Sequence, residues 1–323
     1  MKRWCAGLLL TCMIILAALE EPVTGRAQDL RHNAKIALGS RLFFDPRLSG
    51  DNRMSCAGCH IPELAFTDGR PVAIGRDGRR LSRNTPTLLQ SANNKSQFWD
   101  GRVRTLEDQV LEPIRRSDEM NQNLDDLTAK LSTDPEYVNL FQEAFGSPIT
   151  LQGIAAAVAA FERTLLSRNS PFDRYLAGDR AAISAETQRG MTIFQTKGGC
   201  ASCHEGLDFT DHKFHNLGVP ERDPLHPDPG RYLVTNNEAD RGAFKTPTLR
   251  NIAQTAPYMH NGIFKTLEEV VAFYNNGGGK NPHLDDAMTP IGLTRQEQQN
   301  LVAFLKSLTG KLPTIIPPTF NTP

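Results

Sequence analysis

The sequence has few cysteine and tryptophan residues and no excess of charge of either sign, so its composition alone does not indicate a particular class of protein. Only six of its 323 residues are cysteine and two are tryptophan, and 36 lysine and arginine residues balance 36 aspartate and glutamate residues. The zero net charge gives no electrostatic basis for binding nucleic acid or an anionic membrane surface. Strand-like alternation of apolar and polar residues is weak throughout. At 39% hydrophobic and 22% charged, the composition is that of a soluble globular protein, and the chain is long enough for two domains.

The N-terminus carries the longest apolar run. Lys2 and Arg3 precede apolar residues 6–19, and a polar stretch then ends near Ala27. This order predicts a secretory signal peptide over residues 1–27 and export to the periplasm. The run is short for a membrane span, so a retained anchor is the alternative, and no membrane span is expected in the mature chain. Removing three basic and two acidic residues with the peptide leaves 33 basic and 34 acidic residues.

Four cysteines remain after this cleavage, and their spacing is more informative than their number. They lie in CAGCH at 56–60 and CASCH at 200–204. This spacing, with histidine directly after the second cysteine, is typical of c-type heme attachment. The thiols bind the porphyrin and the histidine ligates the iron. Two disulfides and zinc binding, which needs further spaced ligands, are the alternatives. The predicted heme-binding residues are Cys56, Cys59 and His60 in the first motif and Cys200, Cys203 and His204 in the second.

The two motifs belong to two related halves of the chain. NTPTLLQ at 84–90 is similar to KTPTLRN at 245–251, and DGRVRTLEDQV at 100–110 is similar to NGIFKTLEEVV at 261–271. Both pairs share an offset of 161 residues. We therefore predict a mostly all-α fold of two cytochrome c-type heme domains related by an internal repeat.

Helical spacing of apolar residues and N-terminal capping residues support this fold class. We predict an N-terminal heme domain over residues 28–178 and a C-terminal heme domain over 179–323. The proline-rich end of the second domain is expected to form an extended tail. Helices are predicted over residues 36–44, 133–146, 150–166, 188–194 and 293–308.

The repeat allows the surroundings of the two hemes to be compared. Tyr274 lies near the end of a predicted helix, and the 161-residue offset pairs it with Pro113. Proline cannot bind iron. We therefore predict a six-coordinate second heme, held by His204 and Tyr274, and a five-coordinate first heme, held by His60. A filled heme transfers electrons, whereas an open heme can bind peroxide or oxygen.

The predicted open side of the first heme has candidate catalytic groups. Gln109 lies four residues before Pro113, and Glu119 lies six residues after it. A carboxylate there can move a proton between peroxide oxygens and assist O–O cleavage, and an amide can orient the bound oxygen. Outside a heme site, Glu119 would be interpreted as a surface or capping residue.

Trp99 is the only tryptophan of the predicted mature chain, and it lies in FWDGR between heme-linked segments. It is a candidate electron relay or, alternatively, a core anchor. Arg102 in the same motif could pair with a heme propionate or form a simple ion pair at a helix start. The repeat pairs Trp99 with His260.

These residues together resemble a known family. Over nearly all of the mature sequence the chain is similar to bacterial di-heme cytochrome c peroxidases and their MauG branch. The matching segments are SCAGCHIPELAFTDGR, RNTPTLL, FWDGR with LEDQ, CASCH, FKTPTLRNIAQTAPYMHNG and TLEEVVAFY. The resemblance implies two mostly α-helical cytochrome c domains with a calcium ion between them.

The resemblance also assigns roles to individual residues. It implies that His60 binds the catalytic heme, with Gln109, Pro113 and Glu119 on the opposite side, and that Trp99 lies between the hemes. His204 then binds the second heme. The residues matching the family's calcium ligands are Asn84, Thr255 and Pro257, the last two through carbonyl oxygens.

Two positions distinguish the branches of this family. Arg76 stands where other di-heme peroxidases have a loop histidine that closes the catalytic iron, and Tyr274 stands where they have methionine. Tyrosine there resembles MauG, and a phenolate ligand would lower the heme potential. Met259 and Met288 are the alternative ligands.

Three functions are compatible with these residues. The first is a MauG-type enzyme that uses H2O2, or O2 plus electrons, to oxidise a partner protein, by resemblance the precursor of methylamine dehydrogenase during tryptophan tryptophylquinone maturation. The second is a peroxidase that reduces H2O2 with electrons from a small cytochrome c or cupredoxin. The third is an electron carrier without peroxide chemistry, against which Pro113 argues.

Overall fold

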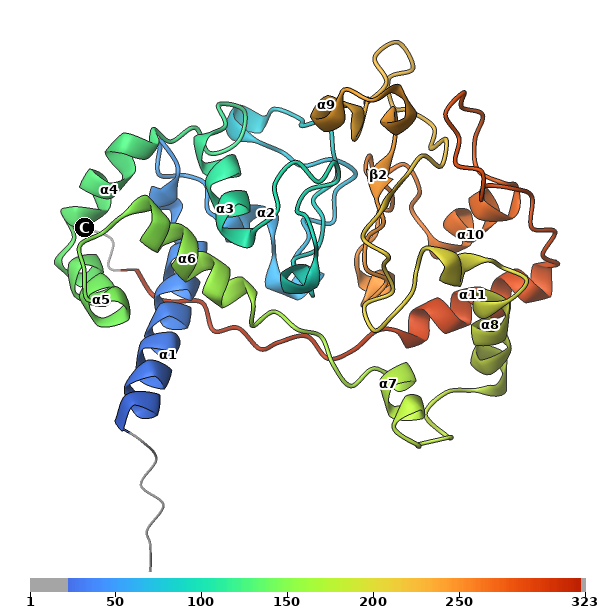
Figure 1. Ribbon diagram of the computed structural model, residues 1–323, viewed down its shortest axis with the longest axis horizontal. Coiled ribbons are helices and arrows are strands. Elements are labelled where there is room, and N and C mark those ends of the chain that lie inside the picture. Colours follow the sequence, from blue (N-terminus) through green and yellow to red (C-terminus); the bar gives the residue numbers. More distant parts are fainter. Residues whose placement is uncertain (1–22, 321–323) are drawn as a thin grey trace, which may run out of the picture.

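The computed structural model describes residues 23–320, and side chains from residue 28 onward (Figure 1). The predicted signal peptide, residues 1–27, lies outside the described side chains. None of the helices in the described part is long and apolar enough to cross a membrane. The regular elements are α1 (Val23–Phe44), α2 (Cys56–Cys59), α3 (Leu106–Arg115), α4 (Leu124–Ser132), α5 (Pro135–Phe145), α6 (Leu151–Glu162), α7 (Pro171–Leu176), α8 (Ala185–Gln195), β1 (Phe214–His215), α9 (Tyr232–Thr235), β2 (Phe244–Lys245), α10 (Leu267–Asn275) and α11 (Arg295–Ser307).

Two hydrophobic cores lie side by side and confirm the mostly helical, two-domain fold. In the first, α1 packs against α6; in the second, α8 packs against α11. Each pair has a glycine at its contact: a Cβ at Gly39 would overlap the Ala157 carbonyl, and one at Gly190 would overlap the Asn300 carbonyl. The two domains therefore share the same close helix crossing.

The helix starts follow the capping residues in the sequence. Asp134 caps α5 with proline at its first position, and Thr150 caps α6. Thr294 and Glu297 form a capping box at the start of α11, in which each side chain accepts a hydrogen bond from the other's backbone N–H. These three helices confirm the sequence predictions.

The internal repeat is also visible in the backbone. The isolated bridge between Gln97 and Val103 has its equivalent, at the 161-residue offset, in the bridge between Tyr258 and Phe264. The helices α3 and α10 that follow begin at equivalent residues, each after a threonine cap. The only strands of the described chain, β1 and β2, form a two-residue antiparallel ladder in the second half.

Two segments cross between the halves. Phe172 of α7 packs in the second core, although the predicted domain boundary at 178/179 assigns it to the first. In the other direction, Figure 1 shows the C-terminal tail running back from α11 toward α4 and α5. Leu312 and Ile315 of this tail pack on the first core, and the Lys311 N–H donates to the Arg168 carbonyl at 2.9 Å. The tail therefore ties the second half to the first.

Candidate heme sites and the interface between the halves

The two CxxCH histidines are oriented alike. His60 Nδ1 lies 3.0 Å from the Phe66 carbonyl oxygen, and His204 Nδ1 lies 2.9 Å from that of Phe209. Burial lowers the pKa of both histidines, so each is neutral and donates its Nδ1 proton to the backbone. Each Nε2 lone pair is then free for a metal, as in histidine ligands oriented by a second hydrogen bond.

The four motif cysteines are free thiols rather than disulfides. Burial raises the pKa of Cys56 to about 12 and that of Cys200 to about 11. A thiol pair on one short turn, with an oriented histidine directly after it, fits covalent heme attachment at each motif.

A cavity of about 460 Å³ lies beside the second motif. It has the size of a cofactor site, and residues of both halves line it. Among the predicted site residues it brings together Cys200, Cys203, His204, Tyr274, Trp99, Asn84, Thr255 and Pro257.

Tyr274 lies on α10 and lines this cavity together with His204. Burial, together with the nearby Cys200 and Cys203, raises the pKa of its phenol far above the ordinary range. Its hydroxyl forms no hydrogen bond with another described residue. A phenol that borders the cavity without a protein hydrogen-bond partner fits an iron ligand, although Met259 and Met288 line the same cavity.

The predicted open side of the first heme is built on α3. Gln109 and Pro113 lie one turn apart, on the same face of this helix. The Gln109 amide oxygen is buried and has no hydrogen-bond partner among the described residues. The chain after α3 folds back, because the Met120 N–H donates to the Pro113 carbonyl at 3.1 Å. This return brings the neighbouring Glu119 toward the helix.

Glu119 is largely buried beside the first motif. Its charge contributes to the raised pKa of Cys59, which burial mainly causes. Burial raises the pKa of Glu119 itself, opposed by Arg116, whose Nε lies 2.9 Å from its carboxylate. A carboxyl group with a raised pKa close to the heme-binding turn can hold and release a proton.

The loop that contains Arg76 is held against this segment. The Arg76 N–H donates to the Asp118 carbonyl at 3.1 Å, and the Arg76 Nε lies 3.7 Å from the Asp51 carboxylate. Arg76 thus makes protein contacts at the place where a loop histidine would close the iron.

The interface between the halves has approximate two-fold symmetry. The Asn84 N–H donates to the His260 carbonyl at 2.7 Å, and the Lys245 N–H donates to the Trp99 carbonyl at 2.8 Å. The 161-residue offset relates Asn84 to Lys245 and Trp99 to His260, so the second bond repeats the first with the halves exchanged. Trp99 therefore lies where the two halves meet, and its Nε1 donates to the Asn84 carbonyl at 3.0 Å.

His260 has a different environment from its counterpart Trp99. It stacks on Phe244 with a ring separation of 3.6 Å. Its buried Nε2 has no hydrogen-bond partner among the described residues and lies 4.0 Å from a Glu221 carboxylate oxygen. Burial lowers the pKa of His260 to about 4, so it is a neutral group in the interface.

Asn84, Thr255 and Pro257 fit a hard cation. The Asn84 amide nitrogen donates to the Arg70 carbonyl at 2.8 Å, which leaves its Oδ1 free. The carbonyls of Thr255 and Pro257 accept no hydrogen bond from described residues, and all three residues line the same cavity. Uncharged oxygens of this kind are suitable calcium ligands.

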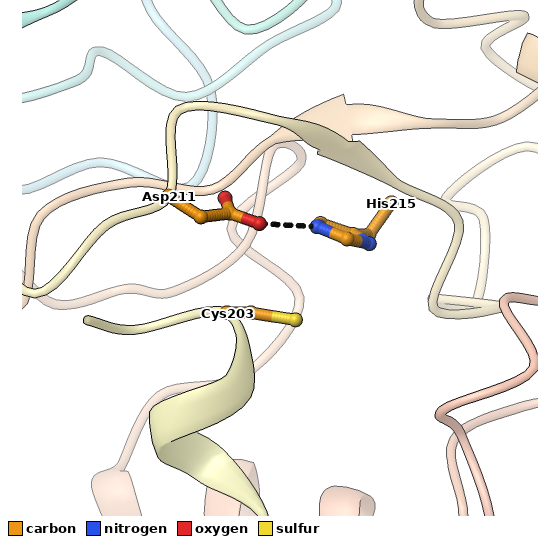
Figure 2. A group of neighbouring side chains, drawn as sticks. All are labelled: Cys203, Asp211 and His215. Atoms are coloured by element: carbon orange, nitrogen blue, oxygen red, sulfur yellow. Dashed lines mark hydrogen bonds and ion pairs between the residues drawn. The ribbon is translucent and has the colours of Figure 1, made fainter.

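One further cluster lies beside the second motif (Figure 2). Cys203, Asp211 and His215 have ligand atoms within 4.8 Å of one another. The Cys203 thiol here stands for the sulfur that would bond to heme, so it is not free to bind a metal. His215 is held at 3.0 Å by Asp211 and at 2.6 Å by Asp285. With Cys203 as a free thiol, this neighbour and the two carboxylates raise the pKa of His215 to about 10.

Sequence reasoning missed several of these groups. The sequence analysis assigned no role to Lys245 or to the His215 cluster. The 161-residue offset, which pairs Lys245 with Asn84, was an available signal for Lys245, and the His215 cluster has no motif of its own.

The two halves, each with a CxxCH turn and a backbone-oriented histidine, define a two-domain c-type cytochrome. Residues 33–181 match the family described as di-haem cytochrome c peroxidase, and residues 187–309 match cytochrome c. The chain belongs to the di-heme cytochrome c peroxidase/MauG family of heme-dependent oxidoreductases.

Relatives of both branches are similar to the chain. Methylamine utilization protein MauG of Methylorubrum extorquens is 44% identical, over 85% of this chain and 78% of its own. Cytochrome-c peroxidase IdrP1 of Denitromonas iodatirespirans is 41% identical, over 87% and 83%. The crystal structure of a MauG-like protein associated with microbial copper homeostasis superposes with a TM-score of 0.79 at 36% identity, covering 86% and 90% of the two chains.

Proposed function

We propose that the protein is a periplasmic MauG-type oxidoreductase that uses H2O2, or O2 plus electrons, to oxidise a partner protein. The observation that carries this proposal is the pairing of Tyr274 with Pro113 at equivalent positions of α10 and α3. A phenol without a hydrogen-bond partner lines the cavity beside the second motif, whereas proline would leave the first heme without a second protein ligand. By similarity to MauG relatives, the partner is the precursor of methylamine dehydrogenase, and the reaction completes its tryptophan tryptophylquinone.

Individual residues would have separate roles in this reaction. Two bound hemes would supply the redox chemistry, one reducing peroxide and the other transferring electrons. Glu119 would hold and deliver the proton, since its pKa is raised by burial. The side-chain amide of Gln109, whose buried oxygen lacks a hydrogen-bond partner among the described residues, would orient the oxygen substrate. Trp99, at the contact between the halves, would lie on the electron path.

Three further assignments belong to this proposal. Residues 1–27 direct export, and residues 28–178 and 179–323 form the catalytic and electron-transfer domains. One calcium ion binds at Asn84, Thr255 and Pro257 and joins the halves.

A second function is favoured by one specific observation. Met259 and Met288 line the same cavity as Tyr274. If either of them held the second iron, the protein would be a cytochrome c peroxidase that reduces H2O2 with electrons from a small cytochrome c or cupredoxin.

An EPR spectrum of the diferric holo-protein, followed by one equivalent of H2O2 without reductant, separates the two functions. The MauG-type function predicts one high-spin signal and one low-spin signal, both lost on adding peroxide. Two low-spin signals that respond only after one heme is reduced would reject it in favour of the peroxidase. A positive result would be followed by assay with precursor methylamine dehydrogenase.

A further inference from the structure

The approximate two-fold symmetry of the interface generates a counterpart of the calcium site. The 161-residue offset converts Asn84, Thr255 and Pro257 into Lys245, Asn94 and Ser96. In the first site Asn84 comes from the first half and the two carbonyl residues come from the second. In its counterpart Lys245 comes from the second half, and Asn94 and Ser96 come from the first. The reciprocal hydrogen bonds of Asn84 and Lys245 hold both positions in place.

Lys245 is the unusual member of this counterpart. It is only 8% exposed, and no carboxylate of the described chain lies within ion-pair distance of it. Its ammonium has three donors, but the one hydrogen bond it forms with described residues is to the Asn94 Oδ1, at 3.5 Å. Burying a lysine ammonium with one long hydrogen bond costs free energy unless neighbouring oxygens compensate its charge.

The position of the ammonium corresponds to that of a cation bound at Asn84. A cation bound to Asn84 would lie about 2.4 Å beyond its Oδ1. Because lysine is longer than asparagine, its ammonium reaches about the same distance from the backbone. The carbonyls of Asn94 and Ser96, like those of Thr255 and Pro257, accept no hydrogen bond from described residues. Both sites thus have two backbone carbonyls without protein donors, and the Lys245 ammonium reaches the second site through its hydrogen bond to the Asn94 side chain.

We propose that Lys245 is a built-in cation that occupies the symmetry counterpart of the calcium site. This inference rests on the calcium site proposed above. Its consequence is that a removable divalent ion joins the halves at one site, and a covalently tethered ammonium joins them at the other. The Lys245 backbone also holds the Trp99 carbonyl, so the contact between the halves is partly independent of calcium.

Exchanging the two residues tests the proposal. Purified holo-protein with both hemes is freed of metal with EGTA and titrated with CaCl2 in a calorimeter, with heme content fixing the chain concentration. Wild-type protein should bind about one calcium ion per chain, and Lys245→Asn should bind about two, because it restores an amide oxygen at the counterpart. Asn84→Lys should bind none, and the double exchange should again bind about one.

The outcomes separate the two proposals. If wild-type protein and Lys245→Asn both bind one ion and Asn84→Lys binds none, the calcium site stands and the role of Lys245 is wrong. If wild-type protein binds none, both proposals fail.

Asn84→Lys serves as the second measurement if Lys245→Asn does not fold. A tethered cation should remove the dependence of Tm on calcium that wild-type protein shows. A Tm for Asn84→Lys below that of calcium-free wild-type protein would overturn the proposal.

Discussion

The first and second heme sites are alike on one side and different on the other. Both have a CxxCH turn whose histidine is fixed by a backbone carbonyl. On the opposite side, α3 presents Gln109 and Pro113, whereas the equivalent positions of α10 are Val270 and Tyr274. One half thus has a polar side chain beside a proline, and the other has an apolar side chain beside the tyrosine that we propose as an iron ligand. After duplication, the two copies could keep heme attachment and divide peroxide chemistry from electron transfer.

A second difference between the two heme sites lies on α6 and its equivalent, α11. The crossing of α1 on α6 is equivalent to that of α8 on α11, with Phe161 and Phe304 each beside the crossing glycine. The next residue is Glu162 in the first half and Leu305 in the second. Glu162 is 3% exposed and contributes to the raised pKa of Cys56. The first heme surroundings are therefore more polar on this side too.

The largest expected effect comes from removing the acid that only the first site has. Glu119→Gln should slow the reaction of the diferric holo-protein with H2O2 by about 10²–10⁴-fold, because the amide cannot transfer the proton. Stopped-flow absorbance measures this rate. Glu112→Gln, on α3 and paired with Arg115, is the matched control and should react normally. An unchanged rate in Glu119→Gln would remove Glu119 from the mechanism.

Changing Tyr274, the proposed iron ligand of the second site, should shift a redox potential. Tyr274→Met should raise the second heme's potential by on the order of hundreds of millivolts, within the ~0.8 V range set by axial ligands. Spectroelectrochemistry of the holo-protein measures the shift. Tyr258→Phe alters another tyrosine of the same cavity and should leave the potential nearly unchanged. Equal potentials in wild-type protein and Tyr274→Met would mean that methionine already binds the iron.

The comparison also depends on the halves being held together. Arg83 lies 2.7 Å from Asp228 and 2.6 Å from Asp100, and both carboxylates are mostly buried. Arg83→Ala leaves Asp228 without an ion pair and Asp100 with Arg102 alone, and should lower the free energy of unfolding by about 3–5 kcal/mol. Denaturant unfolding of the holo-protein measures the loss. Arg163→Ala, which breaks an exposed pair with Glu107, should cost at most about 1 kcal/mol; equal losses would mean that Arg83 does not secure the interface.

Local features of this fold could be predicted from the sequence, whereas contacts between the halves could not. The threonine and aspartate caps depend on residues close to them in the sequence, so they predicted the helix starts. The 161-residue offset can be measured directly in the sequence, so it predicted the repeat. The packing of Ile315 on the first core and of Phe172 in the second depends on how the chain crosses between the halves. Lys245 has no local signal either, because its environment comes from the opposite half.

A pH-dependent effect is expected at Glu162, the acid that Leu305 replaces in the second half. Burial raises the pKa of Glu162 from 4.5 to about 8, so the folded state binds its proton more tightly than the unfolded state does. Its contribution to stability is therefore complete below pH 4.5 and is lost as the pH rises through about 8. Within this window the free energy of unfolding should fall by about 1.4 kcal/mol per pH unit from this group alone.

Glu162→Gln keeps the shape of the side chain without the titration, and should flatten this slope in denaturant unfolding at a series of pH values. Glu143→Gln, at an exposed position of α5, should retain it. Glu162→Leu goes further and gives the first half the residue of the second. If the first site needs a protonated carboxyl beside Cys56, Glu162→Leu should slow the peroxide reaction while Glu162→Gln does not. Equal rates in wild-type protein, Glu162→Gln and Glu162→Leu would show that the polarity on the Glu162 side does not contribute to the peroxide reaction.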